Sequence, residues 1–124
     1  MKTILGETEK YITKDGSIIR ELMHPDEHVS SIFSVKNQSL AEATVPAGVA
    51  TVLHKHALTE ELYHITSGKG LMTLGKEQFT VSVGDTVCIP PRTPHCIKNT
   101  GNKDLKINYR GPFDKVLLNQ ESGF

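Results

Sequence analysis

The sequence has no excess of charge of either sign. Its 124 residues include 14 basic and 14 acidic side chains, so the formal net charge is zero. Both signs occur along the whole chain, without the concentrated positive charge of nucleic-acid binders and of proteins that dock on acidic membranes. We therefore expect the partner to be a small molecule, and we expect neither nucleic acid nor membrane as a partner.

Cysteine and long apolar runs are equally scarce. Cys88 and Cys96 are the only cysteines, too few for a disulfide framework, although counting alone leaves a single bridge open. The N-terminal residues 1–10 contain no apolar run longer than Ile4-Leu5, which is far shorter than a secretory signal or a membrane span requires. A cytoplasmic protein with reduced thiols is the expectation that follows.

No segment has the 3.6-residue periodicity of a long helix. Short alternating segments recur instead, interrupted by glycine or proline about every 8–12 residues, which is typical of β-barrels and sandwiches. A chain of this length suffices for one domain with its own core. We predict an all-β fold in a single domain over residues 1–124, with N-terminal strands in 1–35 and a less patterned tail in 111–124. The expected strands cover residues 11–14, 17–22, 31–36, 39–45, 50–56, 61–66, 71–74, 78–83, 86–89, 95–99 and 105–109.

Turn-forming residues separate these strands. Asp15-Gly16 suits a tight hairpin because both residues tolerate positive φ. Gly48, Gly68 and Gly84 are interpreted as turn formers that need positive φ, and the segment 68–70 is expected to turn the chain into the strand at 71–74. Pro90-Pro91 ends the strand before it, because proline cannot donate to a β-ladder.

His54 and His56 are separated by one residue. On a strand, residues i and i+2 point to the same face, so the two imidazoles are expected to converge. On a helix they would lie roughly 200° apart, and a helical metal site uses a spacing of three or four. The spacing therefore favours a metal site built on a strand, although a lone pair of this kind is more often not a pair of ligands.

Further residues at fixed distances extend this pair into two motifs. The first consists of Gly48, His54, His56, Glu61 and Gly68, and the second of Gly84, Pro90, Arg92, His95 and Asn99. By these motifs the chain resembles a single-domain cupin (monocupin) of the small microbial type. The two signatures span residues 48–68 and 84–99. Only Arg92 departs from them, because the second signature has glycine there.

This resemblance implies a small β-barrel or jelly roll, the double-stranded β-helix of cupins, with a metal site inside it. The ligands would be His54, His56, Glu61 and His95, with Glu60 as a less favoured alternative to Glu61. Three imidazoles and one carboxylate suit one divalent transition metal (zinc, iron, manganese, nickel or copper) without choosing among them. Four ligands on an ion that accepts five or six leave a position open for a substrate.

The activity implied is that of a metal-dependent isomerase, lyase or dioxygenase acting on a small oxygenated substrate such as a sugar acid, a keto acid or a diol. One fold hosts many chemistries, so the resemblance does not choose among them. Two alternatives stay open: a non-catalytic cupin that binds or senses a small ligand, and a metal-free, epimerase-like barrel in which histidine acts as a base. Unprotected edges of the N-terminal strands favour a homodimer, which is common among cupins.

Two further residues are candidates for the substrate pocket. The alternation that turns Glu61 inward also turns Tyr63 inward, where it contacts either the substrate or only the core. Arg92 lies in the turn before His95, where its guanidinium either grips a carboxylate or phosphate or is simply solvated. Asn99, by contrast, is expected to bind backbone rather than substrate.

Overall fold

The computed structural model describes residues 2–13, 16–24, 38–112 and 121–122. Most of these residues lie in strands. A single 3-10 turn, η1 (Leu5–Glu7), precedes them. The strands in chain order are β1 (Lys10–Ile12), β2 (Ile18–Met23), β3 (Gln38–Val45), β4 (Lys55–His56), β5 (Glu61–Ser67), β6 (Lys69–Leu74), β7 (Glu77–Ser82), β8 (Thr86–Ile89), β9 (His95–Asn99), β10 (Leu105–Pro112) and β11 (Glu121–Ser122).

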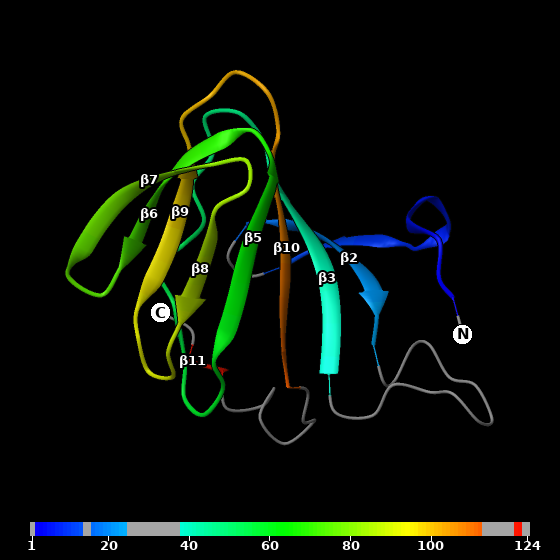
Figure 1. The fold of residues 1–124 in the computed structure, drawn as a ribbon, viewed down its shortest axis with the longest axis horizontal. Coiled ribbons are helices and arrows are strands. Elements are labelled where there is room, and N and C mark those ends of the chain that lie inside the picture. Colours follow the sequence, from blue (N-terminus) through cyan, green and yellow to red (C-terminus); the bar gives the residue numbers. More distant parts are fainter. Residues whose placement is uncertain (1, 14–15, 25–37, 113–120, 123–124) are drawn as a thin grey trace.

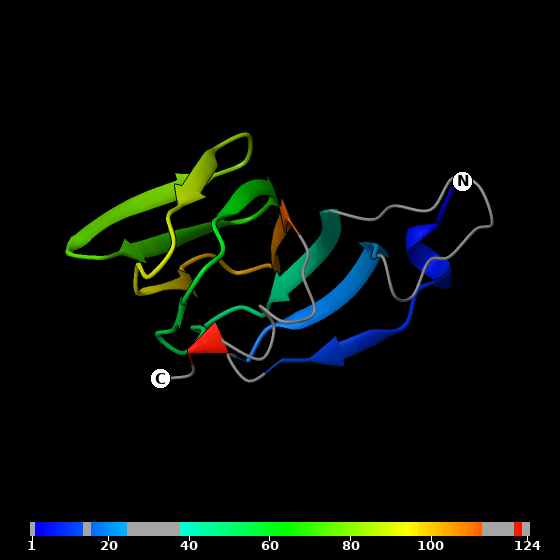
Figure 2. The ribbon, with the colours of Figure 1, turned by 90° about the horizontal axis from the view of Figure 1, so that it is seen from below.

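The strands pair in antiparallel sheets. One sheet has the order β1-β2-β3-β10-β5-β8, a second has the order β7-β6-β9, and β11 pairs with β4. Figure 1 shows β5, β10, β3 and β2 side by side, with β6, β7 and β9 as a separate group, and Figure 2 shows the two groups from below. This arrangement confirms the all-β jelly-roll fold class.

The core lies between the sheets and follows from strict alternation. Along β5, Leu62, His64 and Thr66 are exposed, whereas Tyr63 is half-buried and Ile65 is buried. Inward residues of neighbouring strands meet them and make one apolar cluster. Its fully buried members are Ile19, Ala41, Ala43, Val45, Ile65, Met72, Val81, Val87, Ile89, Ile97, Leu105 and Ile107. The expected inward direction of Tyr63 is therefore confirmed.

Most expected strands are present within one or two residues of their bounds, but two expectations were wrong. Residues 69 and 70 belong to β6 rather than to a turn. Gly70 is required there because a Cβ would lie 2.7 Å from the Lys98 carbonyl oxygen on β9. Residues 50–56 do not form one strand, because Ala50 and His54 bridge to β9 whereas β4 pairs with β11. The strand expected at 31–36 lies outside the described residues.

The turn glycines have the expected conformation. The φ angles of Gly48, Gly68 and Gly84 are 78°, 78° and 93°. Gly68 is constrained twice, because an added Cβ would also lie 2.7 Å from the Asp104 carbonyl oxygen. Side chains larger than hydrogen are therefore disfavoured at this turn by both backbone conformation and space.

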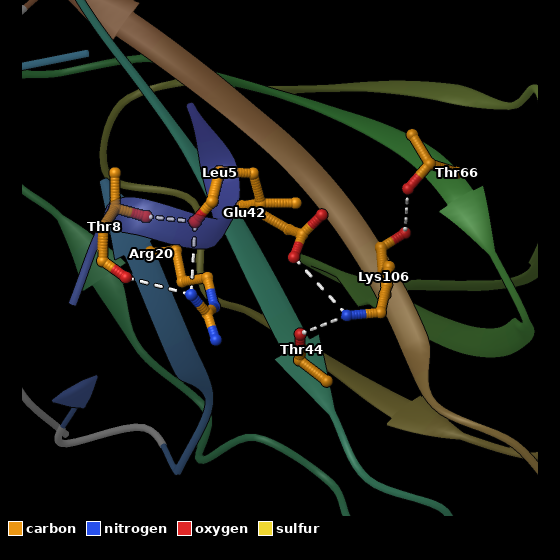
Figure 3. A network of polar contacts seen from close by, with 7 residues as sticks. All are labelled: Leu5, Thr8, Arg20, Glu42, Thr44, Thr66 and Lys106. Atoms are coloured by element: carbon orange, nitrogen blue, oxygen red, sulfur yellow. Dashed lines mark hydrogen bonds and ion pairs between the residues drawn. The ribbon is translucent and has the colours of Figure 1, made fainter. Parts of the chain in front are cut away.

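Polar contacts hold the N-terminal segment and the outer face of the large sheet (Figure 3). The Arg20 guanidinium donates to the carbonyl oxygens of Leu5 and Thr8 at 3.2 and 2.9 Å, which holds η1 against β2. Lys106 Nζ lies 3.4 Å from Glu42 Oε1 on the neighbouring β3. A partly exposed pair of this kind contributes about 1 kcal/mol or less, so it orders the surface more than it stabilises the fold.

Candidate metal centre

His54 forms an isolated antiparallel bridge with His95 on β9, at the edge of the three-stranded sheet. The His54 N–H donates to the His95 carbonyl at 3.0 Å, and the His95 N–H donates to the His54 carbonyl at 2.8 Å. Residues that exchange both bonds in an antiparallel pair have adjacent side chains. The two rings accordingly lie with their centroids 4.2 Å apart. Two candidate ligands that are distant in sequence are thus brought together by backbone pairing.

His56 completes a group of three histidines, His54, His56 and His95, which we call the histidine cluster. The His56 ring centroid lies 5.3 Å from that of His54 and 5.5 Å from that of His95. One nitrogen from each residue lies within 4.8 Å of the other two, so the cluster is positioned to hold a metal ion. Two nitrogens at about 2.1 Å from one ion are at most about 4.2 Å apart, so a small inward shift of the rings would suffice.

Glu61 lies beside the cluster at the start of β5. Its Oε1 is 2.5 Å from His56 Nε2 and 3.7 Å from His95 Nε2, and its side chain is only 14% exposed. A nearly buried carboxylate needs a positive partner to offset its desolvation. The carboxylate oxygen is therefore aimed at the same space as the imidazole nitrogens, where a cation would be favoured. Glu60, the alternative ligand, is exposed.

Backbone carbonyls fix the orientation of two rings. His54 Nδ1 lies 2.8 Å from the Val52 carbonyl, and His95 Nδ1 lies 2.9 Å from the Thr93 carbonyl. Because a carbonyl only accepts, Nδ1 must donate in both, and a neutral ring then carries its lone pair on Nε2. His95 Nε2 is buried and makes no hydrogen bond within the described part of the chain. Such a nitrogen fits a metal ligand held by an outer hydrogen bond.

The charge state of His95 agrees with this role. Burial lowers the pKa of His95 below its ordinary value of 6.5, and the neighbouring His54 and His56 lower it further. The hydrogen bond to Thr93 and the Glu61 carboxylate oppose that shift but do not cancel it. His95 is therefore neutral near pH 7, which is the form that binds metals.

The two pocket candidates lie near the cluster. The Tyr63 ring is edge-on to His95, with centroids 6.1 Å apart, and its centroid is 6.2 Å from that of Tyr109 on β10. The Arg92 N–H donates to the His56 carbonyl at 2.7 Å. Arg92 is exposed and is the one non-glycine residue with positive φ, +60°, among the described residues.

Asn99 behaves as the sequence suggested. It is 1% exposed, and its Nδ2 donates to the carbonyls of Val45 and Lys103 at 2.8 and 2.7 Å. Its Oδ1 accepts from the Gly101 N–H at 2.9 Å. Every polar atom of the side chain thus binds backbone, which leaves it no part in ligand binding.

Three structural features near the site were not predicted from the sequence. The carbonyls of Val52 and Thr93 orient rings, but a backbone atom has no identity in a sequence. Tyr109 joins Tyr63 through the pairing of β10 with β5, and that pairing is non-local. The strand β11 places Glu121 opposite His56 in register, within the tail in which the sequence predicted no strand.

Comparisons with known proteins agree with this geometry. The cupin domain family, Cupin_2, matches residues 41–109. The chain is 56% identical over 107 residues to the uncharacterized protein MJ1618 of Methanocaldococcus jannaschii, covering 86% of this chain and 82% of that protein. It is 32% identical over 111 residues to the mannose-1-phosphate guanylyltransferase RfbM of Salmonella typhimurium. That match covers 85% of this chain but only 23% of the transferase.

A solved structure shares the fold. It is that of a predicted oxalate decarboxylase from Thermotoga maritima, which superposes with a TM-score of 0.74 at 23% identity. The match covers 92% of this chain and 100% of the other.

None of the helices within the described residues is long and apolar enough to cross a membrane.

Proposed function

We propose that this chain, which belongs to the cupin domain family, binds one divalent transition metal and is a metal-dependent enzyme acting on a small oxygenated substrate. The proposed ligands are the histidine cluster and Glu61, in one domain that spans residues 1–124. The observation that carries the proposal is the convergence of three imidazole nitrogens within 4.8 Å. Two of these rings are anchored through Nδ1 to carbonyls, which favours the ligand tautomer.

The protein groups would do three things around a bound ion. The carbonyls of Val52 and Thr93 hold the rings of His54 and His95, so that these two rings would need only a small shift when the ion enters. The burial of His95 keeps its imidazole neutral. Tyr63, edge-on to His95, closes one side of the cluster against water. A bound divalent ion would supply a Lewis acid that polarises a carbonyl or hydroxyl oxygen of the substrate.

The reaction class we propose is isomerisation, lyase chemistry or dioxygenation of a sugar acid or keto acid. The names of two similar proteins, a predicted oxalate decarboxylase and a mannose-1-phosphate guanylyltransferase, refer to small anionic oxygen compounds, which supports this substrate class. The alternative is a cupin that binds or senses such a ligand without turnover. Turnover of a panel of sugar acids and keto acids by protein loaded with zinc or with iron would separate the two.

The test of the metal site compares ligand variants with a matched histidine control. We expect His54→Ala and His95→Ala to weaken metal binding by about 100-fold or more while the far-UV circular dichroism spectrum is kept. His64→Ala is the control, because His64 is exposed on the outer face of β5 and should leave metal binding unchanged. Metal content is measured by element analysis of protein purified without a histidine tag.

Two outcomes of that experiment would contradict the metal site. Wild-type protein without a stoichiometric transition metal, even after loading, would remove it. Variants that still bind one equivalent as tightly as the wild type would remove the assignment of these ligands.

Glu61→Gln keeps the shape of the side chain, and we expect it to weaken metal binding by about 10–100-fold if the carboxylate is the fourth ligand.

We also propose a homodimer in the cytoplasm. Among the strands that the structure describes, β1 is the edge of the large sheet, and Ile12 on it is 75% exposed. An exposed apolar edge strand is a template for pairing with a second copy of the same strand about a two-fold axis. The free thiols of Cys88 and Cys96 suit a reducing compartment.

A further inference from the structure

Arg92 has a left-handed backbone conformation, which is unfavourable for a residue with a long side chain. Its φ of +60° lies in the left-handed region, where the Cβ of an L-residue crowds the backbone. Arginine also lacks the short polar side chain that lets asparagine or aspartate adopt this conformation more easily. Glycine, which the cupin signature has at this position, would be free of strain. A strained residue beside a candidate site indicates that its side chain has a use there.

Arg92 is tied to the histidine cluster from both sides. Its N–H donates to the carbonyl of His56 at 2.7 Å. The carbonyl of the next residue, Thr93, accepts from the His95 ring. The guanidinium itself is exposed and makes no hydrogen bond or ion pair with any described residue. The turn thus fixes the backbone of Arg92 beside the cluster and leaves its guanidinium available to a ligand.

We propose that Arg92 binds an anionic group of the substrate, a carboxylate or a phosphate, next to the histidine cluster; this rests on the proposed function. A guanidinium presents two parallel N–H donors that match the paired oxygens of either group. The two positive charges of a divalent ion, less the one negative charge of Glu61, leave one positive charge at the cluster. That charge and the guanidinium both favour an anion over a neutral sugar.

The experiment measures ligand binding by isothermal titration calorimetry on the full chain loaded with zinc. The probes are gluconate, glucose 6-phosphate and uncharged glucose, which separate a carboxylate from a phosphate and both from the sugar alone. Arg92→Ala removes the guanidinium but keeps Cβ, and Arg92→Gly removes both. Arg92→Lys keeps the positive charge but lacks the two parallel N–H donors of the guanidinium. Arg110→Gln is the control, since Arg110 is an exposed arginine on the outer face of β10.

We expect wild-type protein to bind at least one of the two anions more tightly than glucose. Arg92→Ala and Arg92→Gly should weaken that binding by about 10–100-fold, and Arg92→Lys should weaken it less. The affinity for glucose should not change, and Arg110→Gln should behave as the wild type. Because only the glycine variant relieves the strain, its Tm should exceed that of the alanine variant by about 3–6 °C.

Two results would overturn the proposal. They are an undetectable affinity of the zinc-loaded wild type for both anions, and an anion affinity that survives in both Arg92→Ala and Arg92→Gly. The zinc stoichiometry of each protein is measured first. A wild type that binds no zinc refutes the proposed function itself. If the wild type binds zinc and the Arg92 variants bind the anion as tightly as the wild type does, only this inference is refuted.

Discussion

Removal of the Asn99 side chain should destabilise the folded scaffold without touching the candidate metal site. In Asn99→Ala, the buried Val45 carbonyl loses its donor, which costs about 1–3 kcal/mol. The Lys103 carbonyl and the Gly101 N–H lose partners as well, but they are only part-buried and regain water, at about 0.5–1.5 kcal/mol each. The expected loss is therefore about 2–6 kcal/mol, a large share of the 5–15 kcal/mol that stabilises a typical domain.

Urea unfolding followed by far-UV circular dichroism measures this loss. The midpoint should fall while the slope of the transition stays unchanged, because the same surface is exposed on unfolding. Asn102→Ala is the matched control, since Asn102 is exposed in the same loop, and it should change the free energy of unfolding by less than about 0.5 kcal/mol. A loss below about 1 kcal/mol in Asn99→Ala, or a loss of metal affinity without a loss of stability, would refute the structural role.

Three further changes test the packing, the charge of His95 and the assembly. Gly70→Ala should destabilise by about 1–3 kcal/mol, because its Cβ would meet the Lys98 carbonyl, whereas Gly6→Ala, with open space around it, should be neutral in the same urea titration. The unfolded state binds a proton at the His95 position more readily than the folded state does. Hence the free energy of unfolding of EDTA-treated protein should decrease as the pH falls below 6.5 and level off below the folded-state pKa; a flat profile from about pH 7.5 to 5 would contradict this. Ile12→Glu should convert the dimer to a monomer, and light scattering that finds a micromolar wild type already monomeric would remove the dimer.

Local patterns predicted much of the fold. Alternation in residues 61–66 gave the inward direction of Tyr63, and the turn glycines gave their positive φ. The segments 86–89 and 95–99 match β8 and β9 at both ends. Side-chain direction, turn conformation and strand bounds depend on neighbours in the sequence, and they could therefore be predicted from it. Strand order was not readable, because the pairing of β10 with β3 and β5 joins segments that are far apart in the chain.

The convergence of His54 and His56 was predicted for a reason that is only partly right. Two-residue periodicity requires a continuous strand, yet His54 bridges to His95 whereas His56 pairs with β11. The rings nevertheless converge, because each segment is fixed by its own partner. A sequence pattern can thus identify ligands while the forces that place them remain non-local.

His95 is both a fully buried polar residue and a member of the candidate metal centre. It has no exposed surface, it exchanges two backbone hydrogen bonds with His54, and its ring is held by the Thr93 carbonyl. Folding therefore buries a neutral imidazole with one unsatisfied nitrogen, which costs free energy in the absence of an ion. Because an ion would bind the folded state and satisfy that nitrogen, metal at 100 times its Kd would add about 2.7 kcal/mol to stability. A metal ion bound by the histidine cluster would therefore offset the cost of burying His95, and folding would be linked to metal binding at this residue.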